Sequence, residues 1–410
     1  MTATGAASGG GLVLTLNAGS SSLKFALFSG PQATPGRVLS GAVERIGLTP
    51  ARLRIGGDAG MAEADCAAPD HAAALDLVLQ RIGPASGARG LAAVGHRVVH
   101  GGADCDCPET VDDALLARLD ALVPMAPLHQ PHNLAGIRAM RARRPDLPQV
   151  ACFDTAFHHS LPQIAQMLPL PRELWAQGLR RYGFHGLSYE FILQDLRQRE
   201  PVAAEGRIVI LHLGNGASMA ALRDGQSVET TMGFSALGGL MMGTRSGDLD
   251  PGILLWLMAQ KGLNAAVLER LLYRQSGLFG VSGGTRNMRD LLAARADDPR
   301  AAQAVELFCY RAGMRLAGLT AAIGGLDRVI FTGGIGANAP EVRAGIAQGL
   351  EHLGIRIDPA RNDRGDSRIS PDAASVVVEA IATDEELMIA RHTLCALVRL
   401  QSRERGTCHA

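Results

Sequence analysis

The segment Leu12–Phe28, LVLTLNAGSSSLKFALF, has two apolar runs separated by a polar turn. The first run, Leu12–Leu16, has the composition of a strand, the turn is Asn17–Ser22, and apolar residues resume at Leu23. Apolar runs of this length on either side of a glycine- and serine-rich turn are typical of a β-hairpin. We therefore expect a strand, a tight turn and a second strand at the start of the fold.

A similar segment begins the second half of the chain, at Ile208–Leu222, IVILHLGNGASMAAL. When the two segments are superposed, Gly19 falls on Gly216 and Ser21 falls on Ser218. An ancient duplication explains this match and predicts two related α/β domains facing each other. Chance similarity between two glycine-rich hairpins is the alternative.

Apolar spacing predicts the remaining elements. We expect helices over Val111–Pro124, Leu187–Glu200, Ile253–Ala259, Ala301–Ile323 and Pro340–Gly354. We expect strands over Ala93–Val99, Val150–Phe153, Val329–Phe331 and Ala374–Ile381. The helices at 253–259 and 301–323 should pack on a sheet. Thr383 is the expected cap of the closing helix, with Glu386 at the capping-box spacing.

Composition limits the class of protein. A chain of 410 residues is too long for one ordinary core, so two domains are expected. The formal net charge is zero, which gives no general attraction to nucleic acid or to an anionic membrane. No apolar run reaches the roughly 18 residues that a membrane helix requires. Residues 1–11 are small and polar, and we expect a flexible tail there, not a signal peptide.

The cysteines favour a reducing compartment. Seven are scattered without paired spacing, at Cys66, Cys105, Cys107, Cys152, Cys309, Cys395 and Cys408. An odd number in this arrangement argues against a disulfide framework. Cys105 and Cys107 lack the second pair that a zinc site needs. We expect a cytoplasmic protein.

The first hairpin turn has the residues of a phosphate site. Its backbone N–H groups and hydroxyls can approach phosphate oxygens, and Lys24 adds a positive charge. Lys24 and Lys261 are the only lysines in the chain. The P-loop pattern is absent, so a Walker-type NTPase is not expected. An ordinary serine- and glycine-rich turn is the alternative.

Two arginines lie in glycine-bounded segments, Arg97 in GHRVVHGG and Arg245 in GTRSGD. A pair of guanidinium groups suits in-line phosphoryl transfer between two anions, because the transition state spreads negative charge over the equatorial oxygens. Asp154 follows a predicted buried strand, where α/β folds place catalytic carboxylates, and His185 lies between aromatic residues and glycines. A surface ion pair is the alternative for Arg97.

Two further groups have competing interpretations. Histidines cluster in APLHQPHN (126–133) and FDTAFHH (153–159), but they lack the spacing of metal ligands. Gly333–Asn338, GGIGAN, follows a predicted strand and begins a helix, which suits binding of a nucleotide's phosphates or ribose. A Rossmann dehydrogenase is the usual competitor, and it is disfavoured because no GxGxxG opens the chain in a βαβ unit.

Taken in order, these segments resemble the acetokinase family of the acetate and sugar kinase/Hsp70/actin superfamily. The resemblance runs from about Leu12 to about Arg391. The blocks that carry it are Asn17–Lys24, Gly95–Gly102, Phe153–His158, Arg181–Ser188, His212–Gly216, Met241–Asp250 and Gly333–Asn338. It implies two duplicated actin-like (ribonuclease H-like) α/β domains with the active site in the interdomain cleft. The implied domains are 12–155 with 386–410, and 156–385 for nucleotide binding and dimerisation.

The resemblance also implies an enzyme that transfers a phosphoryl group to a carboxyl acceptor. The reaction would be reversible and Mg-dependent (Mn possible), from ATP to acetate, giving acetyl phosphate and ADP by direct in-line attack. It implies a cytoplasmic homodimer acting on small molecules in acetyl-CoA biosynthesis, without nucleic acid or membrane partners. A propionate or butyrate kinase with the same mechanism is the near alternative. A non-catalytic ATP-binding regulator is the alternative from another class.

The family's residues map onto this sequence position by position. The metal would be held by Asn17 and Glu385. The catalytic residues would be Arg97, Asp154, His185 and Arg245. The acyl group would contact Arg97, Val99, Leu128, Phe184 and Ala236. The nucleotide would contact Ser20, Ser22, Lys24, His212, Leu213, Gly214, Asn215, Gly216, Asn287, Met288, Arg289, Gly333, Gly334, Ile335, Gly336, Ala337 and Asn338.

Three of these assignments have particular consequences. Asp154 is expected to orient the carboxylate or the arginines, because an ionised carboxylate nucleophile needs no base at neutral pH. Ala236 replaces a proline frequent in the family, which could widen the acyl pocket. Asn287 and Ala337 replace acidic residues common near the adenosine.

Overall fold

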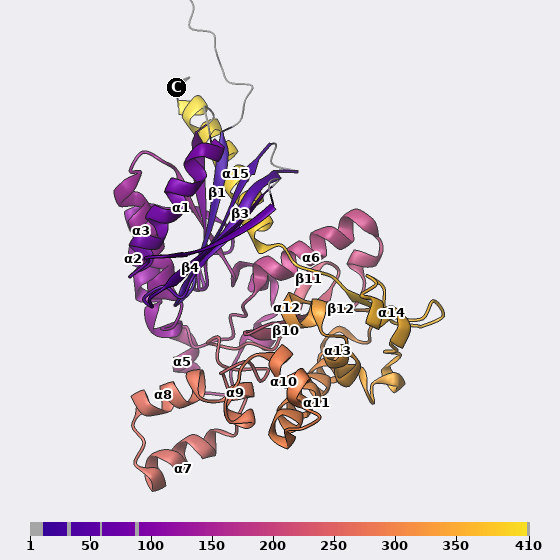
Figure 1. Ribbon diagram of the computed structural model, residues 1–410. Helices are drawn as coiled ribbons and strands as arrows, with labels where there is room; N and C mark the ends of the chain where they lie inside the picture. Colours follow the sequence, from indigo (N-terminus) through magenta and orange to yellow (C-terminus); the bar gives the residue numbers. More distant parts are fainter. Residues whose placement is uncertain (1–10, 31–33, 58–59, 87–89, 408–410) are drawn as a thin grey trace, which may run out of the picture. The chain divides into compact units, whose positions relative to one another are not determined.

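The computed structural model describes residues 11–30, 34–57, 60–86 and 90–407. These residues divide into two compact units (Figure 1). One unit runs to Ala156 and resumes at Asp384, and the other is Phe157–Thr383. Apart from Gly11, the tail expected over residues 1–11 lies outside the described residues.

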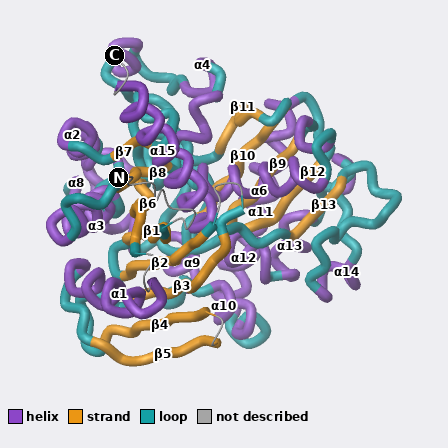
Figure 2. The backbone as a smooth tube through the Cα atoms, turned by 90° about the horizontal axis from the view of Figure 1, so that it is seen from above, coloured by secondary structure: helices purple, strands orange, loops and turns teal. Residues whose placement is uncertain are grey.

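The described part of the first unit contains an eight-stranded sheet in the order β5-β4-β3-β2-β1-β6-β8-β7 (Figure 2). Its strands are β1 (Leu12–Ala18), β2 (Ser22–Ser29), β3 (Gly36–Glu44), β4 (Ala51–Gly57), β5 (Gly60–Cys66), β6 (Leu91–Val98), β7 (Glu109–Thr110) and β8 (Gln149–Phe153). Its helices are α1 (His71–Ser86), α2 (Asp113–Ala121), η2 (Val123–Met125), α3 (Gln130–Arg143) and α15 (Glu385–Thr407). The hairpin expected over Leu12–Phe28 is therefore present as antiparallel β1 and β2.

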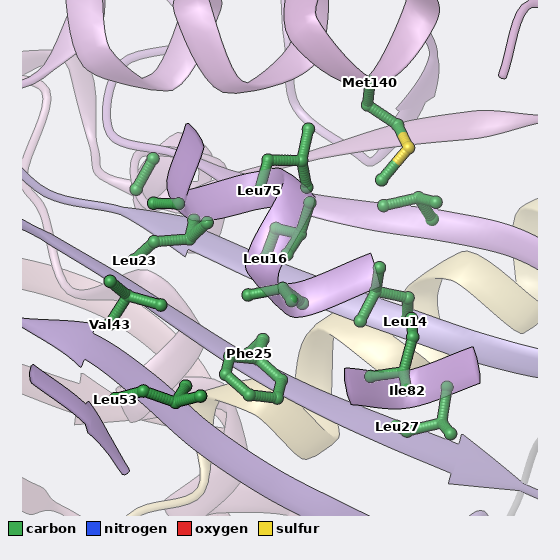
Figure 3. Close-up of a cluster of buried hydrophobic side chains, with 14 of the residues drawn as sticks. Leu14, Leu16, Leu23, Phe25, Leu27, Val43, Leu53, Leu75, Ile82 and Met140 are labelled. Atoms are coloured by element: carbon green, nitrogen blue, oxygen red, sulfur yellow. The ribbon is translucent and has the colours of Figure 1, made fainter. Parts of the chain in front are cut away.

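Strand β1 is mostly apolar because both faces of it are covered, and its one polar residue away from the strand end, Thr15, donates to the Ala26 carbonyl oxygen. Leu14 and Leu16 pack with Leu75 and Ile82 of α1 and with Met140 of α3 (Figure 3). Alternate residues of a strand point to opposite faces, so Val13 lies on the other side, in a cluster with Ala390 of α15. A strand buried on both faces loses the apolar–polar alternation that marks a half-exposed strand.

The close approach of α15 to the sheet explains Gly95 on β6. A Cβ atom added at Gly95 would lie 2.2 Å from Thr393 Oγ1 and 2.5 Å from Ile389 Cγ2. Both distances are far below van der Waals contact, so a larger residue would push the helix away from β6. The glycine before Arg97 thus sets the spacing between the sheet and the last helix.

The second unit contains a five-stranded sheet in the order β11-β10-β9-β12-β13. Its strands are β9 (Ile208–Leu213), β10 (Ala217–Arg223), β11 (Gln226–Thr230), β12 (Arg328–Thr332) and β13 (Val377–Ala380). Its described helices are η3 (Ala156–Ser160), α4 (Gln163–Gln166), α5 (Arg172–Ala176), α6 (Gly186–Arg199), η4 (Ala203–Glu205), α7 (Pro251–Lys261), α8 (Ala265–Arg274), α9 (Gly277–Ser282), α10 (Met288–Ala294), α11 (Pro299–Ile323), α12 (Gly333–Asn338), α13 (Pro340–Ala347), η5 (Glu351–Leu353) and α14 (Pro359–Arg364).

The two sheets share one topology, which supports the predicted duplication. In each, three antiparallel strands (β1–β3 and β9–β11) are followed by two strands that pair in parallel beside the first strand (β6 and β8, β12 and β13). The residue match proposed from sequence is wrong in one detail. Ser21 is exposed in the first turn, whereas Ser218 lies within β10, buried and paired with His212. The two hairpins share their strand–turn–strand arrangement, but Ser21 and Ser218 do not occupy equivalent positions in it.

The packing predictions for two helices have different outcomes. Helix α11 packs against β10 and β11, and its residues Phe308, Ala312 and Leu316 are buried, as expected. Helix α7 does not pack on a sheet and has no buried residue. Trp256 is 53% exposed and Leu255 is 69% exposed. Apolar spacing shows that a helix has a face to bury but does not identify the surface that buries it.

Three element ends differ from the predictions. The helix expected over Pro340–Gly354 stops at Ala347, because Gln348 leaves helical geometry and Gly349 has a φ of 81°. The last strand is shorter than expected, at Val377–Ala380. The closing helix is capped by Asp384 and not by Thr383: Asp384 Oδ1 accepts a hydrogen bond of 2.9 Å from Leu387 N. Aspartate is at least as good an N-cap as threonine, and it stands next to the first helical residue.

None of the helices within the described ranges combines the length and the apolar character needed to cross a bilayer.

Candidate active site

Arg97 on β6 connects three of the predicted site residues in the first unit. Its Nε and Nη2 atoms donate to the Asp154 carboxylate at 3.0 and 2.6 Å. Its Nη1 atom lies 3.5 Å from Asn17 Oδ1 and 3.4 Å from Glu385 Oε2. The amide oxygen and the carboxylate predicted to hold a metal are therefore neighbours of one guanidinium nitrogen.

The carboxylates balance the charge of Arg97 and fix its orientation. Burial by itself lowers the pKa of Arg97, but the nearby Asp154 and Glu385 carboxylates outweigh it, so the pKa is raised. Asp154 is 1% exposed, and its bidentate contact leaves Arg97 little rotational freedom. The result is a rigid cation at the ends of β6 and β8.

The turn of the first hairpin lies next to this cluster. Lys24 on β2 is the cross-strand partner of Asn17, so their side chains are neighbours on the same face. Ser20 is exposed in the turn, and Ser22 is half-buried at the start of β2. His71 Nε2 lies 2.6 Å from the carbonyl oxygen of Gly19 and joins the turn to α1.

Asn133 on α3 holds the ends of β1 and β6 together. Its Nδ2 donates to Ala18 O at 2.8 Å, and its Oδ1 accepts from Val99 N at 3.0 Å. Val99 is buried, and Leu128 is half-buried in the turn before α3. Sequence reasoning noted Asn133 among polar residues without assigning this bridging role.

In the second unit, two histidines are stacked where β9 ends and α6 begins. The rings of His185 and His212 have centroids 4.2 Å apart and planes 21° apart. His185 occupies the residue before α6 with a φ of 60°, a left-handed conformation that only a few side chains adopt. The preceding Phe184 is 1% exposed.

Each histidine is held through Nδ1 by a serine. His185 Nδ1 lies 2.8 Å from Ser218 Oγ, and His212 Nδ1 lies 2.8 Å from Ser188 Oγ. The Ser218 hydroxyl also bonds the Tyr189 hydroxyl at 2.5 Å. Sequence analysis assigned no role to Ser188, Ser218 or Tyr189. The sequence offered a signal for Tyr189 alone, because it follows His185 by one helical turn. The position of Ser218 depends on the packing of α6 against β9 and β10, which the local sequence does not show.

Gly216 allows the turn to approach His185 and Arg245 closely. A Cβ atom at Gly216 would lie 3.3 Å from His185 Nε2 and 3.8 Å from Arg245 Nη1. Arg245 Nη1 also donates to the Ala236 carbonyl oxygen at 2.9 Å. Ala236 is buried. An atom held above this turn would meet an imidazole nitrogen and a guanidinium group together.

The loop that carries Arg245 is tied to the second hairpin. Gly243 N donates to Asn215 O at 3.0 Å, and Gly239 and Asp248 bond each other through N→O contacts of 2.7 and 2.9 Å. These bonds fix the arginine loop to the Gly214–Gly216 turn although neither segment is helix or strand. The structure thus brings His185, His212, Asn215, Gly216 and Arg245 into one group.

His158 has a structural explanation that needs no metal. Its Nε2 lies 3.0 Å from Phe184 O and its Nδ1 lies 2.9 Å from Ser227 Oγ. Burial lowers the pKa of His158 to about 4, so the ring is neutral at pH 7. A neutral ring has one N–H, and a carbonyl only accepts. Nε2 therefore donates to Phe184 O, and Nδ1 accepts from Ser227.

The glycine segment after β12 lies beside the end of β9. Gly333 has a φ of 75°, and a Cβ atom there would lie 2.6 Å from Leu213 O, so glycine is required. The segment forms the short helix α12, which includes Gly334, Ile335, Gly336, Ala337 and Asn338. The predicted change from strand to helix at Gly333 is confirmed.

Arg343 holds α12 in place through hydrogen bonds to its carbonyl oxygens, a role that sequence analysis missed. This side chain is 1% exposed, and its Nη1 donates to Gly336 O and Ala337 O, each at 3.0 Å. Nε and Nη2 donate to the Oδ1 and O atoms of Asn362 at 2.7 and 3.0 Å. Three backbone carbonyls and one amide thus depend on a single guanidinium group.

The segment Asn287–Arg289 stands at the start of α10. The Asn287 side chain caps this helix by accepting from Arg289 N at 3.1 Å. Met288 is 4% exposed and Arg289 is exposed. The asparagine that replaces an acidic residue here therefore has a local helix-capping function.

Comparisons with known proteins agree from end to end. A model described as the Acetokinase family matches residues 12–391. The chain is 48% identical over 389 residues to the acetate kinase of Rhodopseudomonas palustris (strain ATCC BAA-98 / CGA009), covering 93% of this chain and 97% of that protein. It is 43% identical to the propionate kinase of Citrobacter rodentium (strain ICC168), over 93% of this chain and 96% of that protein.

Solved structures give the same picture. The crystal structure of Porphyromonas gingivalis acetate kinase has a TM-score of 0.84 and 35% identity, and the match covers 94% of this chain and all (100%) of that one. The propionate kinase from Francisella tularensis subsp. tularensis SCHU S4 has a TM-score of 0.88 and 33% identity, over 93% and 99% of the two chains.

Replacement of Arg343 by methionine is expected to destabilise the second unit. The change leaves buried carbonyls without their donor, which costs roughly 2–4 kcal/mol of unfolding free energy. Urea denaturation measures this change in the free energy of unfolding. Arg364→Met is the matched control, because Arg364 is an exposed arginine paired with Asp366, and we expect little change. Equal stability of the two variants would contradict the bracing role of Arg343.

Proposed function

Because the chain belongs to the acetokinase family, we propose that it catalyses reversible phosphoryl transfer from ATP to acetate, giving acetyl phosphate and ADP. The observation that carries this proposal is the end-to-end similarity to acetate kinases at 46–48% identity, above the 43% of the propionate kinase. Arg97, Asp154, His185 and Arg245 are all present in ordered positions. A nucleotide switch without an acyl substrate would need none of these residues.

The proposed chemistry is direct in-line attack of an acetate oxygen on the γ-phosphorus of ATP. A new oxygen–phosphorus bond forms as the bond to ADP breaks, and no covalent enzyme intermediate is needed. Arg97 and Arg245 offset the repulsion between two anions. His185 Nε2 hydrogen-bonds an equatorial phosphoryl oxygen. Val99, Leu128, Phe184 and Ala236 would contact the methyl group.

Asn17 and Glu385 are the proposed metal ligands. Both supply oxygen atoms, as Mg²⁺ requires, and both lie within 3.5 Å of Arg97 Nη1. Within the described ranges, no group of three or more His, Cys, Asp and Glu residues is arranged to hold a metal. Mg²⁺ suits a site with few protein ligands, because it takes phosphate oxygens and waters as its other ligands. When bound, the ion would neutralise charge on the nucleotide phosphates.

The nucleotide is proposed to contact both hairpin turns and the glycine segment. Ser20, Ser22 and Lys24 would line the phosphates from the first turn. His212–Gly216 and Gly333–Asn338 would bind from the second unit, with Asn287–Arg289 near the adenosine. The Asn287 side-chain oxygen is already engaged as a helix cap, so we expect this residue to contribute little to base selection.

The acceptor acid is the first property to measure. The purified protein with ATP and Mg²⁺ should form ADP and a hydroxylamine-trapped acyl phosphate across the series formate to butyrate, with a maximum at acetate. One methylene changes the transition-state energy by only about 1–3 kcal/mol in an apolar pocket, so propionate should be a weaker substrate. Arg245→Ala is the inactive control.

Two outcomes would change the proposal. A maximum at propionate or butyrate would keep the mechanism and change the acceptor. No hydroxamate with any acid would contradict kinase activity. Ala236→Pro tests the pocket directly, because proline keeps the carbonyl that accepts from Arg245. We expect a lower propionate/acetate ratio than in the unmodified protein.

Asp154 is expected to act on Arg97 and not on a proton. Asp154→Asn should lower kcat by roughly a hundredfold, because loss of the bidentate contact displaces the guanidinium group. The ratio of kcat between the unmodified protein and Asp154→Asn should be similar from about pH 6 to about pH 9, since the acceptor acid, acetate, is ionised throughout this range. The pH profiles of kcat for the unmodified protein and for Asp154→Asn measure this ratio.

Asp112→Asn provides the matched control, because Asp112 caps the surface helix α2 and asparagine caps equally well. A pH-dependent limb present in the unmodified enzyme and absent from Asp154→Asn would show that Asp154 carries a proton.

We further propose that the protein is a cytoplasmic homodimer. Five cysteines within the described residues, Cys66, Cys105, Cys107, Cys309 and Cys395, are free thiols, which suits a reducing compartment. Helix α7 exposes Ile253, Leu255, Trp256 and Met258, which lie around its circumference and together make an apolar surface that is costly to leave in water. We propose that a second copy of the chain packs against this surface of α7.

Trp256→Glu should convert the dimer to a monomer, since it puts a charge into the apolar surface of α7. Light scattering after size-exclusion chromatography measures the mass. Val202→Glu is the control, because Val202 is 89% exposed and lies outside α7. A monomeric unmodified protein, or a dimeric Trp256→Glu variant, would contradict this interface.

A further inference from the structure

Two carbonyl groups, where β1 passes into the first hairpin turn, are each held by a side chain from a helix. Ala18 O accepts from Asn133 Nδ2 of α3 at 2.8 Å, and Gly19 O lies 2.6 Å from Nε2 of His71 at the start of α1. A carbonyl oxygen only accepts a hydrogen bond, so His71 Nε2 is the donor and must carry a proton. The Gly19 carbonyl is therefore held toward α1.

The other side of the turn is held by backbone groups. Ser22 O accepts from Gly19 N at 2.8 Å, and Ser21 O accepts from Ile46 N at 3.0 Å. Ile46 follows Arg45, whose φ of 58° lies in the left-handed region. This conformation is costly for a residue other than glycine and persists only where the surrounding structure requires it. The chain after β3 is thus shaped to reach the turn.

The direction of a carbonyl group fixes the direction of the next N–H group. A peptide unit is planar and trans, so the C=O of one residue and the N–H of the following residue point in opposite directions. Because His71 holds Gly19 O toward α1, the N–H of Ser20 points away from α1. Ser20 is exposed, so this N–H lies on a side of the turn that is open to a ligand.

Gly19 makes this peptide unit easy to rotate. A Cβ atom at Gly19 would lie 3.1 Å from Ser22 Oγ, so glycine allows the turn to close tightly on Ser22. Glycine also has more accessible backbone conformations than any other residue. Rotation of the Gly19–Ser20 peptide would put a carbonyl oxygen where the N–H had been. A phosphate binds N–H groups and is repelled by carbonyl oxygens, so this one peptide determines whether the turn attracts an anion.

We infer that His71 is a positioning residue for the nucleotide: it holds the Gly19–Ser20 peptide so that Ser20 N–H, and not Gly19 O, faces the phosphate groups. This inference rests on the proposed function, which has the nucleotide phosphates at Ser20, Ser22 and Lys24. It adds a backbone donor to the two hydroxyl groups and the ammonium group of that site. His71 acts through the peptide and does not contact the nucleotide.

The imidazole of His71 is itself held in place. Its ring stacks on that of His132 of α3, with centroids 5.2 Å apart and planes 28° apart. The start of α1 is fixed as well, because Asp70 Oδ1 accepts from Ala73 N at 2.8 Å and caps the helix. Both α1 and α3 pack on the core under β1. The position of His71 Nε2 is therefore set by the same helices that bury the strand leading into the turn.

Nucleotide affinity can be measured without turnover, by isothermal titration calorimetry of the full chain with ADP and Mg²⁺. His71→Gln and His71→Asn differ by one methylene group. The glutamine amide nitrogen reaches the place of His71 Nε2, whereas the asparagine amide is too short to reach Gly19 O. We expect the dissociation constant of ADP to rise about tenfold in His71→Asn, because the phosphate loses a donor, and to stay within about twofold of the unmodified protein in His71→Gln.

Kinetics separate positioning from a general loss of structure. In His71→Asn, KM for ATP should rise by the same factor as the dissociation constant of ADP, with KM for acetate and kcat nearly unchanged, because the lost contact is made equally in the ground state and the transition state. His352→Asn is the matched control, because His352 is an exposed histidine of the second unit whose Nδ1 lies 2.9 Å from Gly349 O. Its affinity for ADP should equal that of the unmodified protein.

Several results would overturn the inference. Unchanged ADP affinity in His71→Asn would do so, and so would equal losses of affinity in His71→Asn and His71→Gln, because the reach of the donor would then be irrelevant. A parallel rise in KM for ATP and for acetate would show a structural role only. ADP binding without acetate-dependent turnover in the unmodified protein would instead contradict the proposed function, and the two variants would still test His71. No binding of ADP by the unmodified protein would overturn both.

Discussion

Burial of the central strands on both faces is the constraint on which this molecule depends. Strand β1 packs against α1 and α3 on one side and α15 on the other. A polar group along such a strand has no access to water and needs a partner inside the protein, as Thr15 has in the Ala26 carbonyl oxygen. The polar residues of the candidate site lie where strands end. Asn17, Arg97 and Asp154 all lie at such ends. The position of the chemistry follows from the packing of the core.

The same constraint explains why the site residues are held so tightly. A charged side chain at the end of a buried strand is partly removed from water, and it must be compensated by partners. Arg97 has Asp154 and Glu385 as such partners. These partners fix orientation as well as charge. A rigid donor needs little reorganisation when a transition state forms, which is the main electrostatic advantage of an enzyme over water.

Much of the fold could be predicted from local sequence, because hairpins have strong short-range signals. The turns at Gly19 and Gly216 lie between long apolar runs, and α11 has regular helical spacing. The end of α13 was mispredicted because Gln348 and Gly349 could equally have continued the helix. Whether α7 would face a sheet or the surface depends on partners distant in the sequence, which apolar spacing does not contain.

The candidate site was predictable only for residues with conspicuous chemistry. Arginines, histidines and aspartates in glycine-bounded segments were found, whereas Ser218, Tyr189 and Arg343 were not. Their functions arise from contacts across the fold: Ser218 and His185 are 33 residues apart in sequence. A buried serine on a strand has no local signal that separates it from an ordinary small residue. Supporting residues of this kind require three-dimensional information.

The return of the last helix to the first unit has a consequence for synthesis on the ribosome. Phe157–Thr383 is one continuous stretch, so the second unit has all its residues before the chain is finished. The first unit lacks α15 until the end, and until then the face of its sheet that includes Val13, Ala26 and Phe28 has no cover. The unit that is made first is thus the last to be completed. For most of translation, its apolar sheet face is a surface that chaperones can recognise.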